Sequence, residues 1–397
     1  MVARVRLAVD ATPLLGPRTG VATFTMGMLG ALGRRADVVA RAYALSWRGR
    51  GLLKEVLPDG VTAGWSVPAA VVLPLWSRTD LLGATWLADV EDGVEVVHGT
   101  NFVVPPARRA ARVVTVHDLT CVHHPALCSR ASLRYPALVR RAVRHGAWVH
   151  TPSAFVAAEV CDVFGADPER VRAVHHGVGA GGGVGGAGVG AGVGGAGGDG
   201  GVGGAGGGVG TPPPEGRYVL ALGTVEPRKD LALLVRAFDL VANGRPDLSL
   251  VIAGPDGWGT AALADALAVA RHRDRIRRVG WVDDARRVEL LAGASAFALP
   301  SVYEGFGLGA LEAMAAGAPV VATAAGAVPE IVGDGAVVVP VGDVAALADA
   351  LGGVLDDDEH AGEVVARGRR RAATFTWECS AAGLVELYVD AMADRCG

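Results

Sequence analysis

Two loops in the second half of the chain carry the residue types best suited to chemistry. In the first loop, Gly223–Asp230, the adjacent cations Arg228 and Lys229 precede a helical pattern. Lys229 is unusual, because only two of the 37 basic residues are lysines. Free N–H groups at a helix N-terminus favour anions and disfavour cations. The pair therefore predicts a bound anion, for which phosphate is the simplest candidate; the alternative is a solvated basic pair.

The second loop, within Pro300–Glu312, combines two glycines with two carboxylates. Gly305 and Gly307 allow the backbone to approach a ligand closely. Glu304 lies on the loop, and Glu312 lies in an otherwise apolar, alanine-rich helical pattern. A carboxylate in apolar surroundings needs hydrogen-bond or charge partners. Sugar hydroxyls would suit both carboxylates, and the alternative for Glu312 is an ion pair with an arginine.

Both loops follow apolar runs that alternate with helical patterns, and this alternation extends over both halves of the chain. It predicts two α/β domains, each a doubly wound parallel sheet covered by helices. Ligands of such sheets bind beyond the carboxyl ends of the strands, where both loops lie. The expected strands are Val5–Val9, Val38–Tyr43, Val94–His98, Val113–Val116, Trp148–His150, Val171–Val174, Tyr218–Leu222, Leu248–Ala253, Ile276–Val279, Ala296–Leu299, Val320–Ala322 and Val337–Val339. The expected helices are Val21–Leu32, Pro68–Leu82, Ser129–His145, Ser153–Phe164, Asp230–Ala242, Ala261–Ala270, Asp284–Ala292, Gly307–Ala315, Val344–Leu355 and Glu378–Ala391.

A glycine-rich segment separates the two halves. Between residues 177 and 210, 22 of 34 residues are glycine, and Pro212–Pro214 follow. Without hydrophobic periodicity, such a segment is expected to be a flexible linker. The expected domains are therefore residues 1–176, a linker at 177–214, a second domain at 215–374, and a final helical segment at 375–397.

The composition restricts the class of protein. A hydrophobic content of 51% supplies two cores, and no run of 18 apolar residues lacks Pro, Gly or charge, so we expect no transmembrane helix. The net charge of −4 does not suggest a nucleic-acid partner. Five scattered cysteines without a C-x-x-C motif, and a start at Met1–Asp10 that does not read as a signal peptide, predict a cytoplasmic protein.

Two motifs together point to a known family. Glu304 and Glu312 form an E-x7-E motif, and the loop G-T-x-E-P-R-K-D precedes it. The chain resembles, over nearly its whole length, the retaining glycosyltransferases of the GT-B fold, family 4, also called glycosyl transferases group 1. The resemblance implies two Rossmann-like domains that face each other across a cleft, with the final helix packed back on the first domain.

The resemblance also implies a donor site for a nucleoside-diphosphate sugar. Arg228 and Lys229 would bind the diphosphate, Glu304 the transferred sugar, and Glu312 the ribose. The loop Gly16–Phe24 departs from the family pattern at Ala22 and Thr23, so Gly20 is its donor-side candidate. The other implied donor-binding residues are Gly223, Trp281, Val282, Gly305, Phe306, Gly307 and Leu308.

Two residues of the first half complete the expected site. His117, in the sequence Val116–Leu119, resembles the family's H-D-L loop and would approach the donor sugar and the reacting centre; a packed loop histidine is the alternative. Asn101 is a weaker candidate for the acceptor side. The expected catalytic group is therefore His117, Glu304, Arg228 and Lys229.

By resemblance, the chain would move a hexose, with mannose as the best guess, to a hydroxyl of a glycan or lipid-linked acceptor, with retention of configuration. No D-x-D motif is present, and Asp283–Asp284 and Asp356–Asp358 are better interpreted as helix caps or solvated charge. We therefore expect no metal and no cofactor. A metal cluster at Cys121, His123, His124 and Cys128 is a weaker alternative, because its spacing is unlike that of zinc sites.

Three other functions compete with transfer. A nucleotide-sugar 2-epimerase or a glycan phosphorylase could use the same fold, although a phosphorylase needs a pyridoxal lysine. A non-catalytic nucleotide-sugar-binding protein is the third. The arginines of Ser129–His145 are also a candidate for contact with anionic lipid at the inner face of the plasma membrane, or simply form a solvated face.

Overall fold

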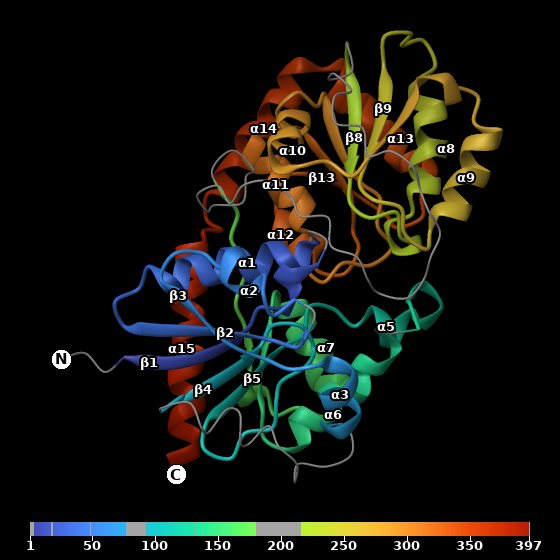
Figure 1. Ribbon diagram of the computed structural model, residues 1–397. Helices are drawn as coiled ribbons and strands as arrows, with labels where there is room; N and C mark the ends of the chain where they lie inside the picture. The colour runs from blue at the N-terminus through green and yellow to red at the C-terminus, as the bar shows by residue number, and fades with distance from the viewer. Residues whose placement is uncertain are drawn as a thin grey trace. The chain divides into compact units, whose positions relative to one another are not determined.

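The computed structural model describes residues 4–16, 19–47, 49–76, 93–130, 132–179 and 216–396. They divide into two compact units (Figure 1). The first unit contains the residues up to Gly177 together with the segment from Phe375 onward, and the second contains residues 216 to Thr374. Most of the expected linker, from residue 180 on, lies outside the described residues, as do residues 77–82 of one expected helix.

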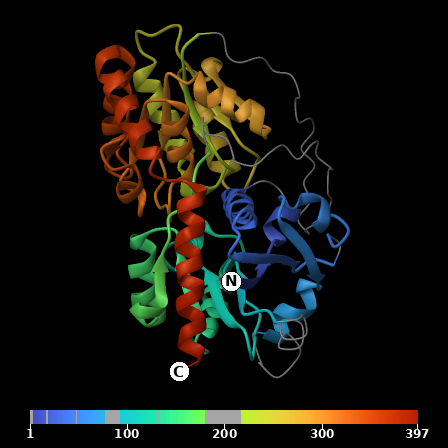
Figure 2. The same ribbon diagram turned by 90° about the vertical axis from the view of Figure 1, so that its left-hand side faces the viewer.

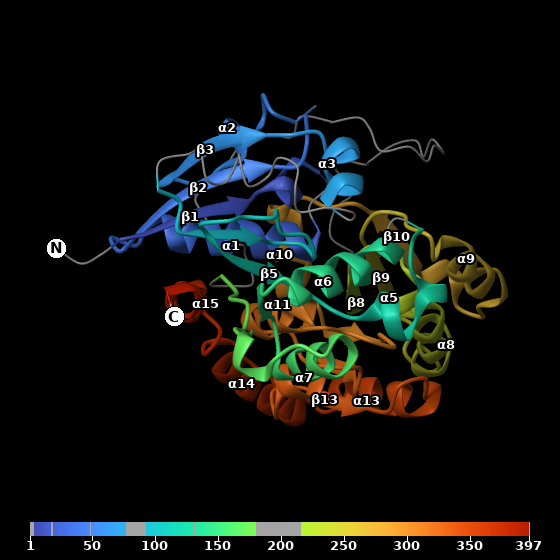
Figure 3. The same cartoon turned by 90° about the horizontal axis from the view of Figure 1, so that it is seen from below.

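The first unit is built on a seven-stranded parallel sheet with the order β3-β2-β1-β4-β5-β6-β7. Figure 3 shows β3, β2 and β1 in succession. Apolar residues occupy both faces of the central strands, as expected for a sheet covered on both sides. The strands are β1 (Val5–Asp10), β2 (Val38–Ala44), β3 (Val61–Ser66), β4 (Val96–Gly99), β5 (Ala111–Thr115), β6 (Trp148–Thr151) and β7 (Val171–Ala173).

Helices cover both faces of this sheet. Alternate residues such as Leu7 and Val9 pack with α1 (Gly20–Gly33) and α15 (Trp377–Cys396) on one face. Val114 and Val149 pack on the other face with α6 and α7. The remaining helices of the unit are α2 (Leu53–Val56), α3 (Ala69–Trp76), α5 (Thr120–His123), α6 (Tyr135–Arg144) and α7 (Ala154–Phe164).

The second unit has a six-stranded parallel sheet with the order β10-β9-β8-β11-β12-β13. Its strands are β8 (Tyr218–Leu222), β9 (Ser249–Ala253), β10 (Ile276–Gly280), β11 (Ala296–Leu299), β12 (Val320–Thr323) and β13 (Val337–Val339). Its helices are α8 (Leu231–Val241), α9 (Thr260–Val269), α10 (Asp284–Ala292), α11 (Leu308–Ala316), α12 (Val328–Val332), α13 (Val344–Asp356) and α14 (Asp358–Ala372). The two doubly wound sheets confirm the expected α/β fold.

The structure corrects several expected elements. The sequence analysis missed β3 and the helices α2, α5, α12 and α14. The helix expected at Ser129–His145 is shorter: a 3₁₀ turn at Ser132–Arg134 precedes α6, which starts at Tyr135 with Pro136 in its first turn. Proline fits the first turn of a helix because its missing N–H has no intrahelical partner there. In the described part of the chain, no helix has the length and apolarity needed to span a bilayer.

The last helix, α15, is an integral part of the first unit. Figure 2 shows it running along the other elements of this unit. Trp377 and Tyr388 are buried against α1 and the sheet. Gly27 of α1 lies directly under the Trp377 indole, where a Cβ atom would overlap the ring. This close approach of the two helices therefore depends on the absence of a side chain at residue 27.

A chain of neutral hydrogen bonds also connects α15 to the sheet. His150 Nε2 must donate to the Val174 carbonyl (3.0 Å), which leaves Nδ1 of a neutral His150 to accept from Thr115 Oγ1 (2.9 Å). His98 Nε2 then donates to Thr115 Oγ1 (2.8 Å), and Tyr388 Oη donates to His98 Nδ1 (2.8 Å). Burial lowers the pKa of His150 to about 3 and the pKa of His98 well below its usual value. Both rings are therefore neutral at physiological pH.

Two glycines of α1 provide a test of this packing. We expect Gly27→Ala to lower the free energy of unfolding of the first unit by about 1–3 kcal/mol, because the new methyl group overpacks against Trp377. Gly30→Ala is the matched control: its nearest neighbours would be Arg34 Nη1 at 3.6 Å and Pro58 Cβ at 3.8 Å, and alanine favours the helix by about 0.5–1 kcal/mol. Urea unfolding, with hydrogen exchange of α1 and α15 as the local readout, should rank Gly30→Ala at or above wild type and Gly27→Ala below it. Equal stability of the two variants would contradict the packing.

Candidate functional site

A cluster of charged side chains with short contacts lies at the carboxyl edge of the second sheet. β8 and β11 are neighbours in this sheet, so the loops that follow them lie side by side. A backbone hydrogen bond from Val302 N to the Arg228 carbonyl (2.9 Å) joins the two loops. Gly223 leaves β8 with φ +138°, a conformation that favours glycine. The sheet topology thus brings together the two loops that the sequence analysis singled out.

Glu304 lies between Arg228 and Lys229. Its Oε2 is 2.7 Å from Arg228 Nη1, and its Oε1 accepts from Lys229 Nζ (2.6 Å) and Ser301 Oγ (2.7 Å). All three charged side chains are largely buried, with exposed fractions of 8% for Glu304, 17% for Arg228 and 18% for Lys229. Burial raises the pKa of Glu304, but the two cations and the hydrogen bonds outweigh it and bring the pKa to about 2. Glu304 is therefore ionised and neutralises part of the charge of the two cations.

The position of the cations differs from the expected one. Arg228 and Lys229 lie on a 3₁₀ turn, Pro227–Lys229, and α8 begins only at Leu231. Asp230 caps this helix with φ +40° and accepts from Leu233 N (3.1 Å). One free N–H group at the start of α8, that of Leu233, thus already has an anionic partner, and the Glu304 carboxylate is an anion next to the cations.

Glu312 has an arginine partner. It is buried in α11, with 3% of its surface exposed, and forms an ion pair with Arg287 of α10. The sequence analysis considered an ion pair with an arginine as the alternative to a sugar contact for Glu312, and this ion pair is present. Arg287 was missed, because an arginine in a pattern of surface helix residues gives no signal of its own.

The backbone around Glu304 is fixed by the neighbouring loop. Ala327 N donates to the Glu304 carbonyl (2.9 Å), and the Gly326 Cα lies so close to the Glu304 backbone that a Cβ would collide with it. Gly307 has φ +94° and precedes α11, which begins at Leu308. Phe306 is buried, with 6% exposed. The expected donor-binding segment Gly305–Leu308 is therefore a turn that starts beside the anchored Glu304 backbone and leads into α11.

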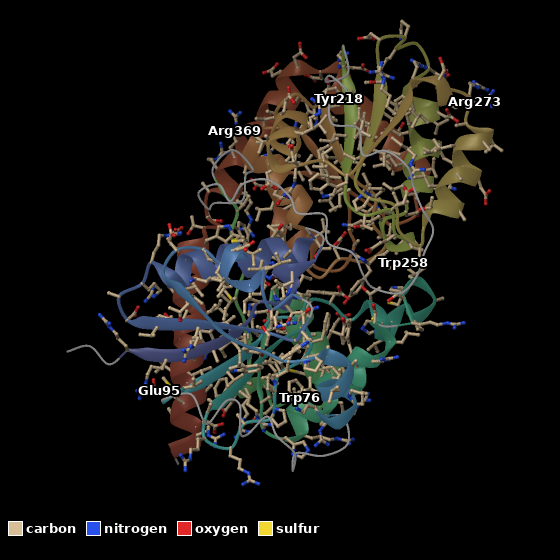
Figure 4. The ribbon with its side chains drawn as sticks, viewed as in Figure 1. Trp76, Glu95, Tyr218, Trp258, Arg273 and Arg369 are labelled. Carbon is tan, nitrogen blue, oxygen red and sulfur yellow. The ribbon has the colours of Figure 1, made fainter. Side chains whose placement is uncertain are left out.

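Two tryptophans lie exposed along the same edge. Trp281, one of the expected base-binding residues with Val282, follows β10 and is 54% exposed. Trp258, which the sequence analysis did not single out, lies between β9 and α9 and is 49% exposed. Figure 4 shows Trp258 at the opposite end of the second unit from Tyr218, the first residue of β8.

In the first unit, His117 is buried just beyond β5. Its Nε2 donates to the Thr100 carbonyl (2.8 Å), and its ring meets Phe24 and Phe102 edge-on, with centroid distances of 5.3 and 5.9 Å. Burial lowers the pKa of His117, and the hydrogen bond and the charge of Asp118 only partly offset this. A neutral ring that donates through Nε2 keeps Nδ1 as an acceptor.

The other expected residues of this unit are Gly20 and Asn101. Gly20 is the first residue of α1, which Thr19 caps through a bond from Ala22 N (3.4 Å), whereas residues 17 and 18 of the same loop lie outside the described residues. Asn101 follows β4 and hydrogen-bonds to the Tyr135 hydroxyl. Sequence reasoning missed Asp10 and Tyr135, which lie close to Asn101, because neither belongs to a spaced motif.

The described ranges contain no group of three or more His, Cys, Asp or Glu side chains placed to hold a metal ion. Within the alternative cluster considered above, His123 Nε2 lies 2.9 Å from a carboxylate oxygen of Glu159. Asp283 and Asp357 are N-caps of α10 and α14, as expected.

The charge arrangement at Glu304 predicts a pH dependence. Because its pKa in the folded state lies below the ordinary value of 4.5, ionisation of Glu304 stabilises the second unit fully above pH 4.5, and this contribution is lost as the pH falls toward about 2. We expect Glu304→Gln to destabilise the unit by about 3 kcal/mol at pH 7, since it leaves the buried Lys229 without its counter-charge and leaves Arg228 with only the longer contact to Glu226 (3.5 Å). The difference from wild type should shrink between pH 4.5 and 3, measured by hydrogen exchange of β8 and β11. A difference that stays constant with pH would argue against an ionised Glu304.

Comparisons with known proteins cover both units. The family described as "Glycosyl transferases group 1" matches residues 209–371, and "Glycosyltransferase Family 4" matches residues 18–180. The O-antigen chain mannosyltransferase B of Escherichia coli is 36% identical over 172 residues, which is 43% of this chain and 45% of that protein. The phosphatidyl-myo-inositol mannosyltransferase of Mycolicibacterium smegmatis is 36% identical over 180 residues, 44% of this chain and 46% of that protein. Each match thus spans less than half of the relative.

A solved structure extends the likeness to the whole fold. Anabaena HepE (Alr3699), crystallised with UDP and glucose, matches with a TM-score of 0.67 over 96% of this chain and 99% of that chain, at 16% identity. This identity supports the fold alone, and the fold is GT-B. The resemblance seen in the sequence is confirmed by the family matches on both halves. The E-x7-E motif and the presence of one doubly wound sheet in each unit agree with it. The chain belongs to the group 1, family 4 glycosyltransferases of the GT-B fold.

Proposed function

We propose that the chain is a retaining glycosyltransferase that moves a hexosyl group, mannose-like in character, from a nucleoside-diphosphate sugar to a hydroxyl of a glycan or lipid-linked acceptor. The observation that carries the proposal is the buried carboxylate of Glu304, held between Arg228 and Lys229 at the carboxyl edge of a parallel sheet. The names of two relatives, both mannosyltransferases, and the UDP and glucose bound to HepE support the choice of substrates.

The two cations supply the electrostatic part of the mechanism. As the bond between sugar and diphosphate breaks, negative charge grows on the departing phosphate oxygens, and cations fixed in advance stabilise this charge. Arg228 is fixed by its bond to the Tyr303 carbonyl (2.9 Å) as well as by Glu304. Arg228 and Lys229 thereby hold the leaving group without a metal ion or cofactor.

Glu304 then has two roles. Without donor, it neutralises part of the charge of the cations; with donor bound, the diphosphate takes up part of their charge, and a carboxylate oxygen becomes able to accept from a sugar hydroxyl. Gly223 and the turn Gly305–Leu308 would contact the phosphates and the sugar. Glu312, oriented by Arg287, would accept from the ribose hydroxyls, and Trp281 and Val282 would lie against the base.

The first unit would supply His117, Gly20 and Asn101. Nδ1 of the neutral His117 can accept from a hydroxyl of the transferred sugar, because Nε2 already donates to Thr100. Gly20, at the start of α1, would face the phosphates, and Asn101 the acceptor.

We also propose that the enzyme acts in the cytoplasm, with peripheral contact to the inner face of the plasma membrane. The support is α6 and the turn before it, where Arg134 and Arg144 are exposed. Anionic lipid attracts such basic helical surfaces.

Ligand binding tests the function directly. We expect at least one of the GDP-, UDP-, ADP- and dTDP-sugars to raise the thermal midpoint of the full chain, because a ligand that binds only the folded state stabilises it.

Glu304→Gln should bind the corresponding nucleoside diphosphate more tightly than wild type, since the competing carboxylate charge is gone, yet should transfer at least 100-fold more slowly. Calorimetry and product analysis separate the two effects. No binding by any donor, or an isomerised nucleotide sugar formed without acceptor, would overturn the proposed function.

Vesicle binding tests the membrane contact. We expect co-sedimentation with phosphatidylglycerol–phosphatidylcholine vesicles to rise with the anionic fraction and to fall in the variant Arg134→Glu/Arg144→Glu. The variant Arg236→Glu/Arg370→Glu removes the same charge from exposed arginines of α8 and α14 and should bind like wild type. Binding that ignores the anionic fraction, or equal loss in both variants, would argue against a membrane-facing α6.

A further inference from the structure

A buried carboxylate that has no counter-charge among the described residues lies at the carboxyl edge of the first sheet. Asp10 ends β1 and is only 2% exposed. Among the described residues, no cation lies within ion-pair distance of its side chain, and its hydrogen bonds come from a single neighbour, Thr12. This contrasts with Glu304 and Glu312 in the second unit, which both have basic partners.

The two hydrogen bonds to Asp10 end on one oxygen. Thr12 N donates to Oδ1 (2.8 Å), and the Thr12 hydroxyl bonds to the same atom. In this second bond the Thr12 hydroxyl donates, because an ionised carboxylate has no proton to give; Thr12 Oγ1 itself accepts from Leu45 N (2.7 Å). Within the described part of the chain, Oδ2 therefore keeps its acceptor capacity unused.

Such a carboxylate is costly to the fold. Burial raises the pKa of Asp10 to about 6, although the bonds from Thr12 oppose the rise. An apolar residue at the end of β1 would avoid this cost. Buried ionisable groups with strongly shifted pKa values and no counter-charge are typical of ligand sites, where the ligand supplies the missing partner.

Polar and aromatic groups surround this carboxylate. β4 and β5 follow β1 in the sheet, and Thr100 Oγ1 donates to the Asp10 carbonyl (2.8 Å), so the loop after β4 lies directly against Asp10. The next residue but one, Phe102, has φ +59°, a strained conformation for a bulky side chain, and stacks on Tyr135 with a centroid distance of 4.7 Å. Asn101 hydrogen-bonds to Tyr135, whose pKa the charge of Asp10 helps to raise.

We propose that Asp10, Asn101 and Tyr135 form a polyol-binding subsite for the acceptor, in which Oδ2 of Asp10 accepts from an acceptor hydroxyl. The ligand class is a sugar or cyclitol ring with adjacent hydroxyls: the carboxylate and the Asn101 amide bind its polar edge, and the Phe102–Tyr135 pair offers an apolar surface for its C–H groups. The subsite rests on the proposed function, because a transferase needs an acceptor hydroxyl.

Among the described residues, burial disfavours the charged form of four other ionisable groups near Asp10. Burial raises the pKa of Tyr43 from β2, of Tyr135 from α6 and of Cys121 from α5, and burial lowers that of His117. Asp118, an acidic residue of the loop after β5, accepts from Thr120 N (2.9 Å). Since a hydrogen bond to an ionised carboxylate is stronger than one to a neutral acid, polyol binding should weaken as the pH falls below about 6.

Asp10→Asn isolates the ligand contact from the fold. Asparagine Oδ1 can accept both bonds from Thr12, so the local structure is retained and the buried charge is removed; only Oδ2, an acceptor, becomes an NH₂ donor. Asp37→Asn is the matched control, because Asp37 lies before β2 at the opposite edge of the sheet, where Arg35 binds it (2.8 Å). Tyr135→Phe, which removes one hydroxyl, is an independent second variant.

The experiment measures binding of two probe polyols, methyl α-D-mannopyranoside and myo-inositol, to the full chain by saturation-transfer NMR, with nucleotide binding by calorimetry on the same samples. We expect at least one polyol to bind wild type and Asp37→Asn equally, with affinity at least tenfold lower in Asp10→Asn and lower in Tyr135→Phe, and with weakening below pH 6 in wild type that Asp10→Asn lacks. The thermal midpoint of Asp10→Asn should equal or exceed that of wild type.

The two readouts separate this proposal from the proposed function. Failure of every nucleotide sugar to bind would remove the function, whatever the polyols do. With nucleotide binding intact, the subsite is overturned if neither polyol binds wild type, or if Asp10→Asn and Tyr135→Phe bind as wild type does. A fall in thermal midpoint together with the loss of polyol binding in Asp10→Asn would also overturn it, because Asp10 would then be structural.

Discussion

One buried carboxylate shared by two cations, Glu304 between Arg228 and Lys229, is the interaction on which the candidate site depends. The nearer of its partners, Lys229, is 75 residues away along the chain, and the adjacency of β8 and β11 brings them together. Charges this deeply buried are stable only as a set, because removal of one leaves the others unpaired. Under the proposed function, an incoming diphosphate would meet cations whose charge Glu304 already neutralises in part. Donor binding would then redistribute charge rather than place an anion beside unpaired cations.

The two units place polar groups in their cores by different means. The second unit pairs charges, as Glu304 and Glu312 show. The first unit instead has a chain of hydrogen bonds between neutral groups. Each group donates to the next, from Tyr388 through His98 and onward to the Val174 carbonyl. A one-directional chain admits one tautomer at each ring, so it specifies the position of α15 more narrowly than apolar contacts alone would. Asp10 differs from both groups: among the described residues it has no charged partner, and it is not part of the neutral hydrogen-bond chain.

Regular apolar patterns made most of the fold predictable from sequence: β8, β11 and α10 begin and end where expected. The missed strand β3 is an edge strand, only partly buried, so its residues do not form the apolar run by which the others were found. The missed helix α14 is mostly polar and packs through few buried residues. In the site, the spacing of Glu304 and Glu312 identified the family, but spacing cannot show that both carboxylates have basic partners. Asp10 was not identified, because it belongs to no motif with a regular spacing and because the feature that distinguishes it, its burial, is visible only in the structure.

The place of α15 in the first unit has a consequence for the order of folding during synthesis. The second unit is continuous from residue 216 to Thr374, and all of it leaves the ribosome before α15 does. The first unit, although most of it is made earlier, lacks one covering layer over β4 and β5 until the end. His98 and the apolar residues under Tyr388 are therefore open to solvent while the second unit forms. The half that is translated first is the half that finishes folding last.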